Sequence, residues 1–300
     1  MAWESFVAAA GRLDVVVSAR LAVPRAQAQR AIAEGRVAVE GRVRPKSFRL
    51  EGGERIEVKI PSPGALEPDP TPVRVLFEDP YLMVVSKPAG VVTHPTAARR
   101  TGTLVNRLLA MGAPLSEAAG ADRPGIVHRL DAGTSGAMLV AKDDRAHGAL
   151  AQMFRQHAIE RRYLALVRGR VGDAEFLVDA PLARRRSKIG VQTATGREAA
   201  TEVSVRERLG RATLVEARPR TGRTHQIRVH LSAIGHPVLG DRVYGGGGDD
   251  ATRLGLSRPF LHSWRLAFDH PITGVRIDVE DPLPDDLVHA LRVARREESR

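Results

Sequence analysis

The sequence contains no cysteine among its 300 residues. Disulfide bonds, thiolate metal sites and a cysteine nucleophile are therefore excluded. No segment approaches the roughly 18 consecutive apolar residues that a membrane-spanning helix requires. The first twenty residues include Glu4 and Asp14 and lack the basic start and apolar run of a secretory signal peptide. We therefore expect a cytoplasmic protein without a membrane partner.

The chain is strongly basic, with 46 lysines and arginines against 35 acidic residues, a net charge of +11 and a pI near 10.9. Such a balance favours a polyanionic partner, and the lack of apolar runs favours nucleic acid over a membrane surface. Biased genome composition is the alternative explanation for the arginine content. The apolar fraction of 43% is enough for a folded core.

A proline-rich stretch divides the chain. Five prolines lie between residues 61 and 72, at Pro61, Pro63, Pro68, Pro70 and Pro72. Such a stretch cannot hold a helix and is typical of a semi-rigid linker. We expect an N-terminal domain over residues 1–60, a linker over 61–72 and a larger domain over 73–300.

The N-terminal segment combines two predicted helices with a small sheet. Apolar residues recur at helical spacing from 13 to 21, and a second helix is predicted from Pro24 through Ile32. Alternating apolar residues then predict a hairpin sheet around Gly41, ending near Ile60. Arginines gather around these elements, at Arg12, Arg20, Arg25, Arg30, Arg36, Arg42 and Arg44.

The pattern over Arg12 to Ile60 resembles the S-four-like RNA-binding module, in which two helices present a basic face to RNA. The resemblance implies that Arg12, Arg25 and Arg36 contact RNA. A solvated basic surface is the alternative interpretation.

The larger segment is rich in strands that do not alternate regularly with helices. Candidate strands cover residues 73–77, 82–85, 137–141, 163–167, 201–205, 212–217 and 275–279. Candidate helices cover residues 104–110, 144–157, 223–234 and 284–294. This order favours an α+β sheet domain over a doubly wound nucleotide-binding fold. The glycine run 245–248 lacks a following Gly-Lys-Ser/Thr, which predicts a flexible loop rather than a phosphate site.

A first candidate site is the run His128-Arg129-Leu130-Asp131, followed by Thr134-Ser135-Gly136. It places a base, a fixed cation, a carboxylate and two hydroxyls in a loop before an apolar strand, where functional residues often lie. An ordinary surface pair of His128 and Asp131 is the alternative interpretation.

A hydrolase is a further alternative. Residues 133–137 are one residue from a Gly-x-Ser-x-Gly elbow, and the order Ser135, Asp241, His262 suits a catalytic triad. An elbow serine follows its strand directly, however, and here the apolar strand comes after Ser135. The pattern therefore disfavours this interpretation.

A second candidate site spans residues 220–231. A helix starting near Arg223 would offer free amides to a phosphate, and His225 and Arg228 would share one helical face. The three histidines His225, His230 and His236 do not share a face, so no metal site is predicted. Tyr163 heads an apolar strand, where a core position is the alternative to a functional role.

Together, these motifs resemble the RluA-type RNA pseudouridine synthases. The resemblance rests on residues 128–136, on Tyr163-x-Ala165 and on residues 222–230, and it covers about Val73 to Leu291. It implies an α+β pseudouridine synthase fold with a central, mostly antiparallel mixed sheet flanked by helices. It also implies an isomerase that needs no cofactor or metal. A catalytically idle RNA-binding factor is the alternative function, and a monomer is the default state.

The resemblance also implies roles for single residues. Asp131 is the catalytic aspartate, Arg228 grips its carboxylate bidentately, and Tyr163 stacks on the uracil and assists proton removal from carbon 5. Arg129 fills the space of a flipped base. Arg223 and His225 contact phosphate or support the motif. The implied partner is structured RNA, most simply large-subunit ribosomal RNA.

Overall fold

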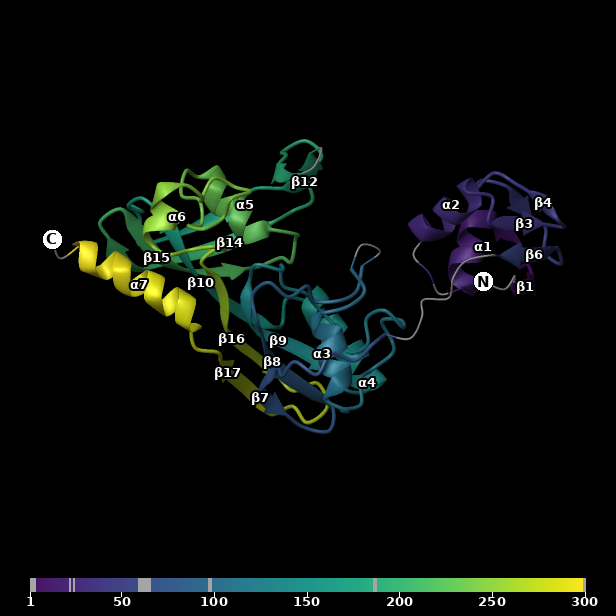
Figure 1. Ribbon diagram of the computed structural model, residues 1–300, viewed down its shortest axis with the longest axis horizontal. Helices are drawn as coiled ribbons and strands as arrows, with labels where there is room; N and C mark the ends of the chain where they lie inside the picture. The colour runs from purple at the N-terminus through teal and green to yellow at the C-terminus, as the bar shows by residue number, and fades with distance from the viewer. Residues whose placement is uncertain are drawn as a thin grey trace. The chain divides into compact units, whose positions relative to one another are not determined.

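The computed structural model describes residues 4–21, 23, 25–58, 66–96, 99–185 and 188–298. The chain divides into two compact units, Met1–Leu66 and Glu67–Arg300 (Figure 1). None of the helices in the described part of the chain has the length and apolar character needed to cross a bilayer. The predicted linker lies partly outside the described residues.

The N-terminal unit packs two helices against a small sheet. The helices are α1 (Leu13–Arg20) and α2 (Arg25–Ala33). A four-stranded sheet has the order β1-β6-β3-β4, with β1 (Glu4–Val7), β3 (Val37–Val39), β4 (Arg42–Val43) and β6 (Arg55–Val58). The short strands β2 (Gly11–Arg12) and β5 (Arg49–Leu50) pair separately.

The core of this unit follows from the apolar stripes of its helices. Leu13, Val17 and Ile32 are buried against strand residues such as Val37 and Ile56. The two predicted helices and the hairpin sheet are therefore confirmed, whereas β1 was not predicted. The predicted boundary residues Pro24 and Ile60 lie outside the described residues.

The C-terminal unit is built on a mixed sheet. The described residues form nine strands in the order β11-β14-β15-β10-β16-β9-β8-β7, with β17 added on β16. All pairs are antiparallel except β16 with β9. The predicted mostly antiparallel mixed sheet is thus confirmed. The strands are β7 (Arg74–Glu78), β8 (Leu82–Lys87), β9 (Ser135–Ala141), β10 (Glu160–Arg168), β11 (Glu175–Asp179), β14 (Ala200–Leu209), β15 (Ala212–Pro219), β16 (Leu261–Asp269) and β17 (Arg276–Glu280).

Strand β16 lies at the centre of this sheet and escaped the sequence prediction. Its first residues, Leu261, His262 and Ser263, mix apolar and polar side chains, yet all three are buried. Its start pairs with β9 and its later part with β17. Long-range pairing, rather than local alternation, therefore makes this segment a strand.

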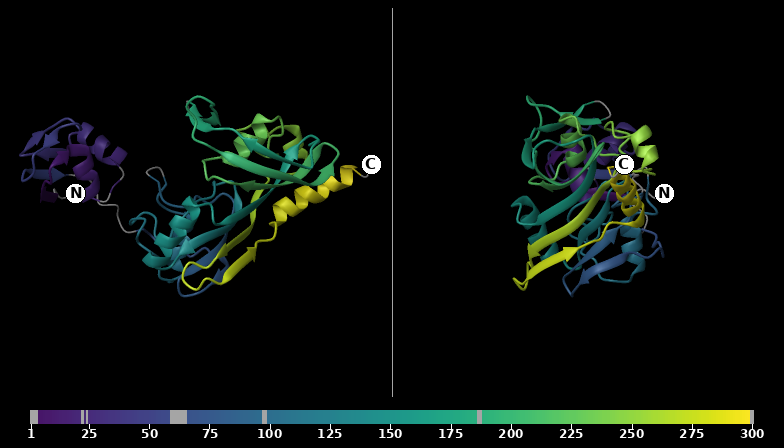
Figure 2. Two further views of the ribbon diagram at one scale, coloured as in Figure 1. Left: turned by 180° about the vertical axis from the view of Figure 1, so that it is seen from behind. Right: turned by 90° about the vertical axis from the view of Figure 1, so that its left-hand side faces the viewer.

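The helices of this unit are α3 (Leu104–Ala110), α4 (Asp144–Arg155), α5 (Gln226–Ala233), α6 (Asp249–Arg253) and α7 (Asp285–Glu298). The prediction for α3 is confirmed. Helix α5 begins three residues later than predicted, and α7 extends four residues further. Helix α6 starts directly after the glycine run and occupies part of a region expected to be loop. Helix α7 packs its apolar stripe on the sheet residues of one core cluster and runs along one side of the unit (Figure 2).

The strands β12 (Leu182–Arg185) and β13 (Lys188–Val191) form a separate hairpin that stands out from the body of the unit in Figure 1. Neither strand was predicted. The hairpin is joined to the unit near Tyr244, because the backbone N–H of Ile189 donates to the Tyr244 hydroxyl at 3.3 Å.

Gly136 is the point where β9 meets β16, and we predict that Gly136→Ala destabilises the unit. An added Cβ would lie 2.3 Å from the Ser263 carbonyl oxygen, and the backbone φ of +124° disfavours side chains. We expect the free energy of unfolding to fall by about 3 kcal/mol, as measured by denaturant titration.

Gly148→Ala is the matched control. Gly148 lies exposed in α4, and nothing lies within 4 Å of its added Cβ. Alanine favours the helix by up to about 1 kcal/mol there. Equal stability of the two variants would contradict the close approach of β9 and β16.

Candidate active site

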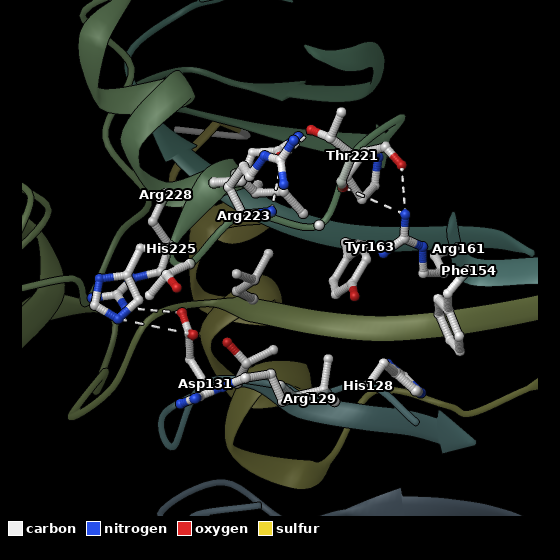
Figure 3. Close-up of a pocket in the computed structure, with 18 of the residues that line it drawn as sticks. His128, Arg129, Asp131, Phe154, Arg161, Tyr163, Thr221, Arg223, His225 and Arg228 are labelled. Carbon is white, nitrogen blue, oxygen red and sulfur yellow. Dashed lines mark hydrogen bonds and ion pairs between the residues drawn. The ribbon is translucent and has the colours of Figure 1, made fainter. Parts of the chain in front are cut away.

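A cavity of about 600 Å³ opens on the C-terminal unit (Figure 3). Its walls come from the loop before β9, from β10 and α4, and from the segment that leads into α5. The charged lining of the described residues is one carboxylate and five arginines, namely Asp131, Arg129, Arg155, Arg161, Arg223 and Arg228. Such a cavity attracts an anionic ligand.

The loop that carries Asp131 is held on both sides by hydrogen bonds. The Thr93 hydroxyl donates to the Leu130 carbonyl at 3.0 Å, and the Gly90 N–H donates to the Ala132 carbonyl at 2.7 Å. Both bonds tie the backbone next to Asp131 to the segment after β8. The backbone on both sides of Asp131 is therefore held by the segment that follows β8.

His128 anchors the start of this loop. Its Nε2 accepts a hydrogen bond from the Leu139 N–H at 2.8 Å, and its ring packs on Phe154 at 4.6 Å. Burial lowers the pKa of His128 to about 3. The imidazole therefore stays neutral and serves as a structural acceptor.

Arg228 links two carboxylates. Its Nε and Nη2 donate to Asp241 at 2.6 and 2.9 Å, and its Nη1 donates to Asp131 Oδ2 at 3.0 Å. Burial is the largest single effect and lowers the pKa of Arg228, but the hydrogen bonds and charges of Asp241 and Asp131 together outweigh it and raise the pKa. The predicted pairing of Asp131 with Arg228 is present, but the bidentate grip falls on Asp241 and not on Asp131.

The start of α5 differs from the prediction. Gln226, its first residue, accepts hydrogen bonds at Oε1 from the Thr221 hydroxyl at 2.6 Å and from the Arg223 N–H at 3.0 Å. The Arg223 side chain donates to the Glu198 carbonyl at 2.9 Å. The expected free amide of Arg223 at a helix start is therefore wrong, because a glutamine side chain already occupies it.

Tyr163 points into the cavity from β10 (Figure 3). Only 7% of its surface is exposed, and burial raises the pKa of its hydroxyl. Arg161, on the same strand, donates through Nη2 to the carbonyls of Pro219 and Thr221 at 3.2 and 3.4 Å. Arg161 thereby holds the segment that precedes α5 over the cavity.

His225 lies beside Asp131 (Figure 3). Its Nε2 is 3.8 Å from Asp131 Oδ1, and its Nδ1 is 2.8 Å from the Tyr244 hydroxyl. Arg129 is exposed at the cavity wall. The structure thus brings Asp131, Arg228, Tyr163, Arg129, Arg223 and His225 to one cavity.

The arginines predicted to contact RNA in the N-terminal unit all have acidic partners. Arg12 and Arg25 reach Asp14 at 3.1 and 2.9 Å, and Arg36 pairs with Glu34. The Asp14 side chain is fully buried, whereas those of Arg12 and Arg25 are 44% and 53% exposed. One buried carboxylate therefore orients two exposed guanidinium groups.

The hydrolase triad is not formed. The Ser135 hydroxyl lies 2.9 Å from Nδ1 of His262, but Nε2 of His262 lies 2.9 Å from the Asp281 carbonyl oxygen. Asp241, the expected third member, is bound to Arg228 instead. The described residues also contain no cluster of three or more His, Asp or Glu side chains that could hold a metal.

Sequence reasoning missed the roles of Asp241 and Tyr244, since the only role considered for Asp241 was as a member of the alternative hydrolase triad. No local pattern identifies Asp241 as the partner of Arg228, because it lies 13 residues from Arg228.

Comparison with known proteins defines the family. Residues 81–233 match the family model described as RNA pseudouridylate synthase, and residues 11–56 match the S4 domain. The chain belongs to the RNA pseudouridylate synthase family, in its RluA-type branch, and is thus an isomerase acting on RNA.

The relatives cover most of the chain. An uncharacterized RNA pseudouridine synthase of Bacillus subtilis, YlyB, is 38% identical over 91% of this chain and 90% of its own. Ribosomal large subunit pseudouridine synthase D of Zymomonas mobilis is 43% identical over 82% of this chain and 80% of its own. The structure of human RNA pseudouridylate synthase domain containing 4 is 25% identical, with a TM-score of 0.59 over 74% of this chain and 93% of that one.

Asp241→Asn tests the buried ion pair. The amide cannot match both guanidinium donors and leaves Arg228, which is 7% exposed, without its main counter-charge. We expect the free energy of unfolding to fall by about 3 kcal/mol, measured by denaturant titration.

Asp286→Asn is the control for this change. Arg258 also binds Asp286 through two hydrogen bonds, but that carboxylate side chain is 49% exposed. An exposed pair is worth at most about 1 kcal/mol. A loss at Asp241 no larger than that at Asp286 would show that burial does not make the Arg228 pair critical.

Proposed function

We propose that this isomerase converts specific uridines to pseudouridine in structured RNA, most simply in large-subunit ribosomal RNA. The observation that carries the proposal is Asp131, held by Arg228 at 3.0 Å in a cavity lined by arginines. Several relatives are named as ribosomal large subunit synthases, which supports the choice of RNA.

The reaction requires one well-placed carboxylate. The bond between uracil nitrogen 1 and ribose carbon 1′ breaks, the base rotates, and carbon 5 bonds to carbon 1′; carbon 5 loses its proton and nitrogen 1 gains one, so no net proton is lost. Asp131 can attack carbon 1′, add to the ring, or remove the 2′ proton to give a glycal. Atoms and electrons balance in each route without a redox partner. Arg228 binds one oxygen of the carboxylate and orients it toward the cavity.

We assign to Tyr163 the contact with the flipped uracil. Its ring lies in the cavity wall where a uracil would stack. Because burial raises the pKa of its hydroxyl, the phenol stays protonated at neutral pH. We therefore assign it to stacking and to relaying the carbon 5 proton, not to action as a phenolate.

Arg129 is assigned to base flipping. A uridine within a stem reaches Asp131 only after leaving its stack, at a cost of a few kcal/mol. Arg129 is exposed beside the cavity, two residues before Asp131 in the sequence. Its side chain can fill the vacated space, while Arg223 and His225 complete the RNA-facing wall.

The N-terminal unit is proposed to add RNA affinity through Arg12, Arg25 and Arg36. Exposed guanidinium groups held on a small folded unit contact phosphates without a large entropic loss. We propose domain limits of 1–60 and 73–300, joined by residues 61–72.

Asp131→Asn should abolish turnover and leave RNA binding largely intact, because the amide keeps the shape but loses the reactive charge. Large-subunit ribosomal RNA transcript is incubated with each protein, and carbodiimide-resistant adducts are mapped. Small-subunit transcript tests the choice of RNA. Binding is measured separately by titration.

Asp173→Asn, at an exposed position away from the cavity, is the matched control and should give the wild-type map. Identical modification maps for wild type and Asp131→Asn would contradict the proposed catalytic role of Asp131. Tight, salt-dependent binding without any conversion by the wild type would instead favour an idle RNA-binding factor.

Arg129→Ala tests base flipping. We expect turnover to fall about tenfold or more on a stem substrate and much less on an unstructured strand with the same uridine. Single-turnover rates on both RNAs provide the measurement.

Arg155→Ala is the control, because Arg155 is another exposed arginine of the cavity wall. It should weaken binding of both RNAs by a similar factor. If Arg129→Ala lowered turnover equally on the stem and on the unstructured strand, the proposed role of Arg129 in base flipping would be contradicted.

A further inference from the structure

His225 has a backbone conformation that its side chain disfavours. It precedes α5 with φ 57° and ψ 17°, in the left-handed region. A non-glycine residue in this region is strained and is retained where the surroundings hold it. In this conformation the imidazole lies beside Asp131 (Figure 3).

Tyr244 contacts both side chains that face Asp131. Its hydroxyl lies 2.8 Å from Nδ1 of His225, and the two rings meet edge to face at 5.6 Å. The guanidinium of Arg228 lies 5.0 Å from the centre of the same ring. The backbone of Tyr244 is fixed to α5 because Ser232 donates to its carbonyl at 2.8 Å.

The hydrogen-bond partners of Tyr244 select the tautomer of His225. The hydroxyl oxygen accepts the Ile189 N–H at 3.3 Å, and its own hydrogen can be donated to Nδ1 of His225, which lies 2.8 Å away. With that hydrogen on the side of Nδ1, the hydrogen of a neutral ring lies on Nε2.

The opposite side of the ring leads to the same tautomer. Nε2 faces Asp131 Oδ1 at 3.8 Å. An N–H there is attracted by the carboxylate, whereas a lone pair would be repelled. Burial lowers the pKa of His225; Asp131 acts against this effect, and Arg228 adds to it. The ring is therefore neutral at working pH and carries a single hydrogen.

We infer that Tyr244 and His225 position the catalytic carboxylate: the tyrosine hydroxyl fixes the Nε2–H tautomer, and that N–H aligns the free oxygen of Asp131. Arg228 binds Oδ2 and His225 faces Oδ1, so two donors set the plane of the carboxylate. The gap of 3.8 Å shortens to a hydrogen bond when a nucleotide fills the cavity. This inference rests on the proposed role of Asp131.

A neutral donor suits this oxygen better than a second cation. Two cations would stabilise the free carboxylate strongly and reduce its reactivity toward carbon 1′ or the 2′ proton. A neutral N–H orients the oxygen with a smaller loss of reactivity. Because His225 acts through Asp131, it is a positioning residue.

Tyr244→Phe separates the hydroxyl from the ring. The variant keeps the aromatic face beside Arg228 and removes the hydroxyl, which contacts Nδ1 of His225 and also accepts the Ile189 N–H. Long-range proton–nitrogen NMR of protein labelled with ¹⁵N-histidine should show a single Nε2–H tautomer for His225 in the wild type and a mixture in the variant. The His225 signals are assigned by their loss in His225→Gln.

Turnover supplies the second measurement. We expect kcat of Tyr244→Phe to fall about tenfold, the equivalent of one neutral hydrogen bond, with KM unchanged. His225→Ala should lose more. His225→Gln, which carries an N–H donor at a similar reach, should recover part of that loss.

Tyr81→Phe is the matched control, since Tyr81 also meets a histidine ring edge to face, His270 at 5.8 Å, but lies outside the cavity. It should leave the His225 signals and kcat unchanged. An unaltered tautomer, or an unaltered kcat, in Tyr244→Phe would overturn the inference. The NMR result does not depend on turnover, so it stands apart from a failure of Asp131 itself.

Discussion

The guanidinium of Arg228, held between two carboxylates, is the interaction on which the site depends. A buried cation is unfavourable without a partner, and Asp241 provides one through two short hydrogen bonds. The third donor, Nη1, is thereby aimed at Asp131. The group of three carries one net negative charge, and that charge faces the cavity. Asp241 therefore makes Arg228 a rigid part of the wall, and Arg228 in turn makes Asp131 an anion of fixed position.

The fold brings these groups together from distant parts of the chain. Asp131 precedes β9, whose parallel contact with β16 requires Gly136, because a side chain there would meet the Ser263 backbone. Arg228 comes from α5 and lies 97 residues after Asp131 in the sequence. The hydrogen bonds of Arg161 to the Pro219 and Thr221 carbonyls connect β10 to the segment before α5. The sheet thus brings together the loop that carries Asp131 and the helix that carries Arg228.

Local patterns predicted much of this architecture, and the failures have physical causes. Helix α3 was predicted correctly because it is stabilised locally: its cap, a box formed by Thr103 and Asn106, lies within its first turn. Strand β16 was missed because its polar residues His262 and Ser263 are buried by neighbours distant in sequence. The start of α5 was misplaced because the Gln226 side chain, rather than a continuing helix, satisfies the amide of Arg223. The motifs indicated which residues meet, but the bidentate partner of Arg228 could be found only in three dimensions.

The site has to satisfy two opposed electrostatic demands. Five arginines around the cavity favour a polyanionic ligand, yet the same positive field would offset the negative charge of Asp131 if all of it acted on that carboxylate. The structure resolves this conflict by dividing the cations. Two donors of Arg228 bind Asp241, and Nη2 of Arg161 binds backbone carbonyls. Arg129 is exposed at the cavity wall. The second oxygen of Asp131 faces a neutral imidazole. The exposed arginines of the cavity wall therefore attract the polyanion, while Oδ1 of Asp131, beside that neutral ring, keeps most of its negative charge.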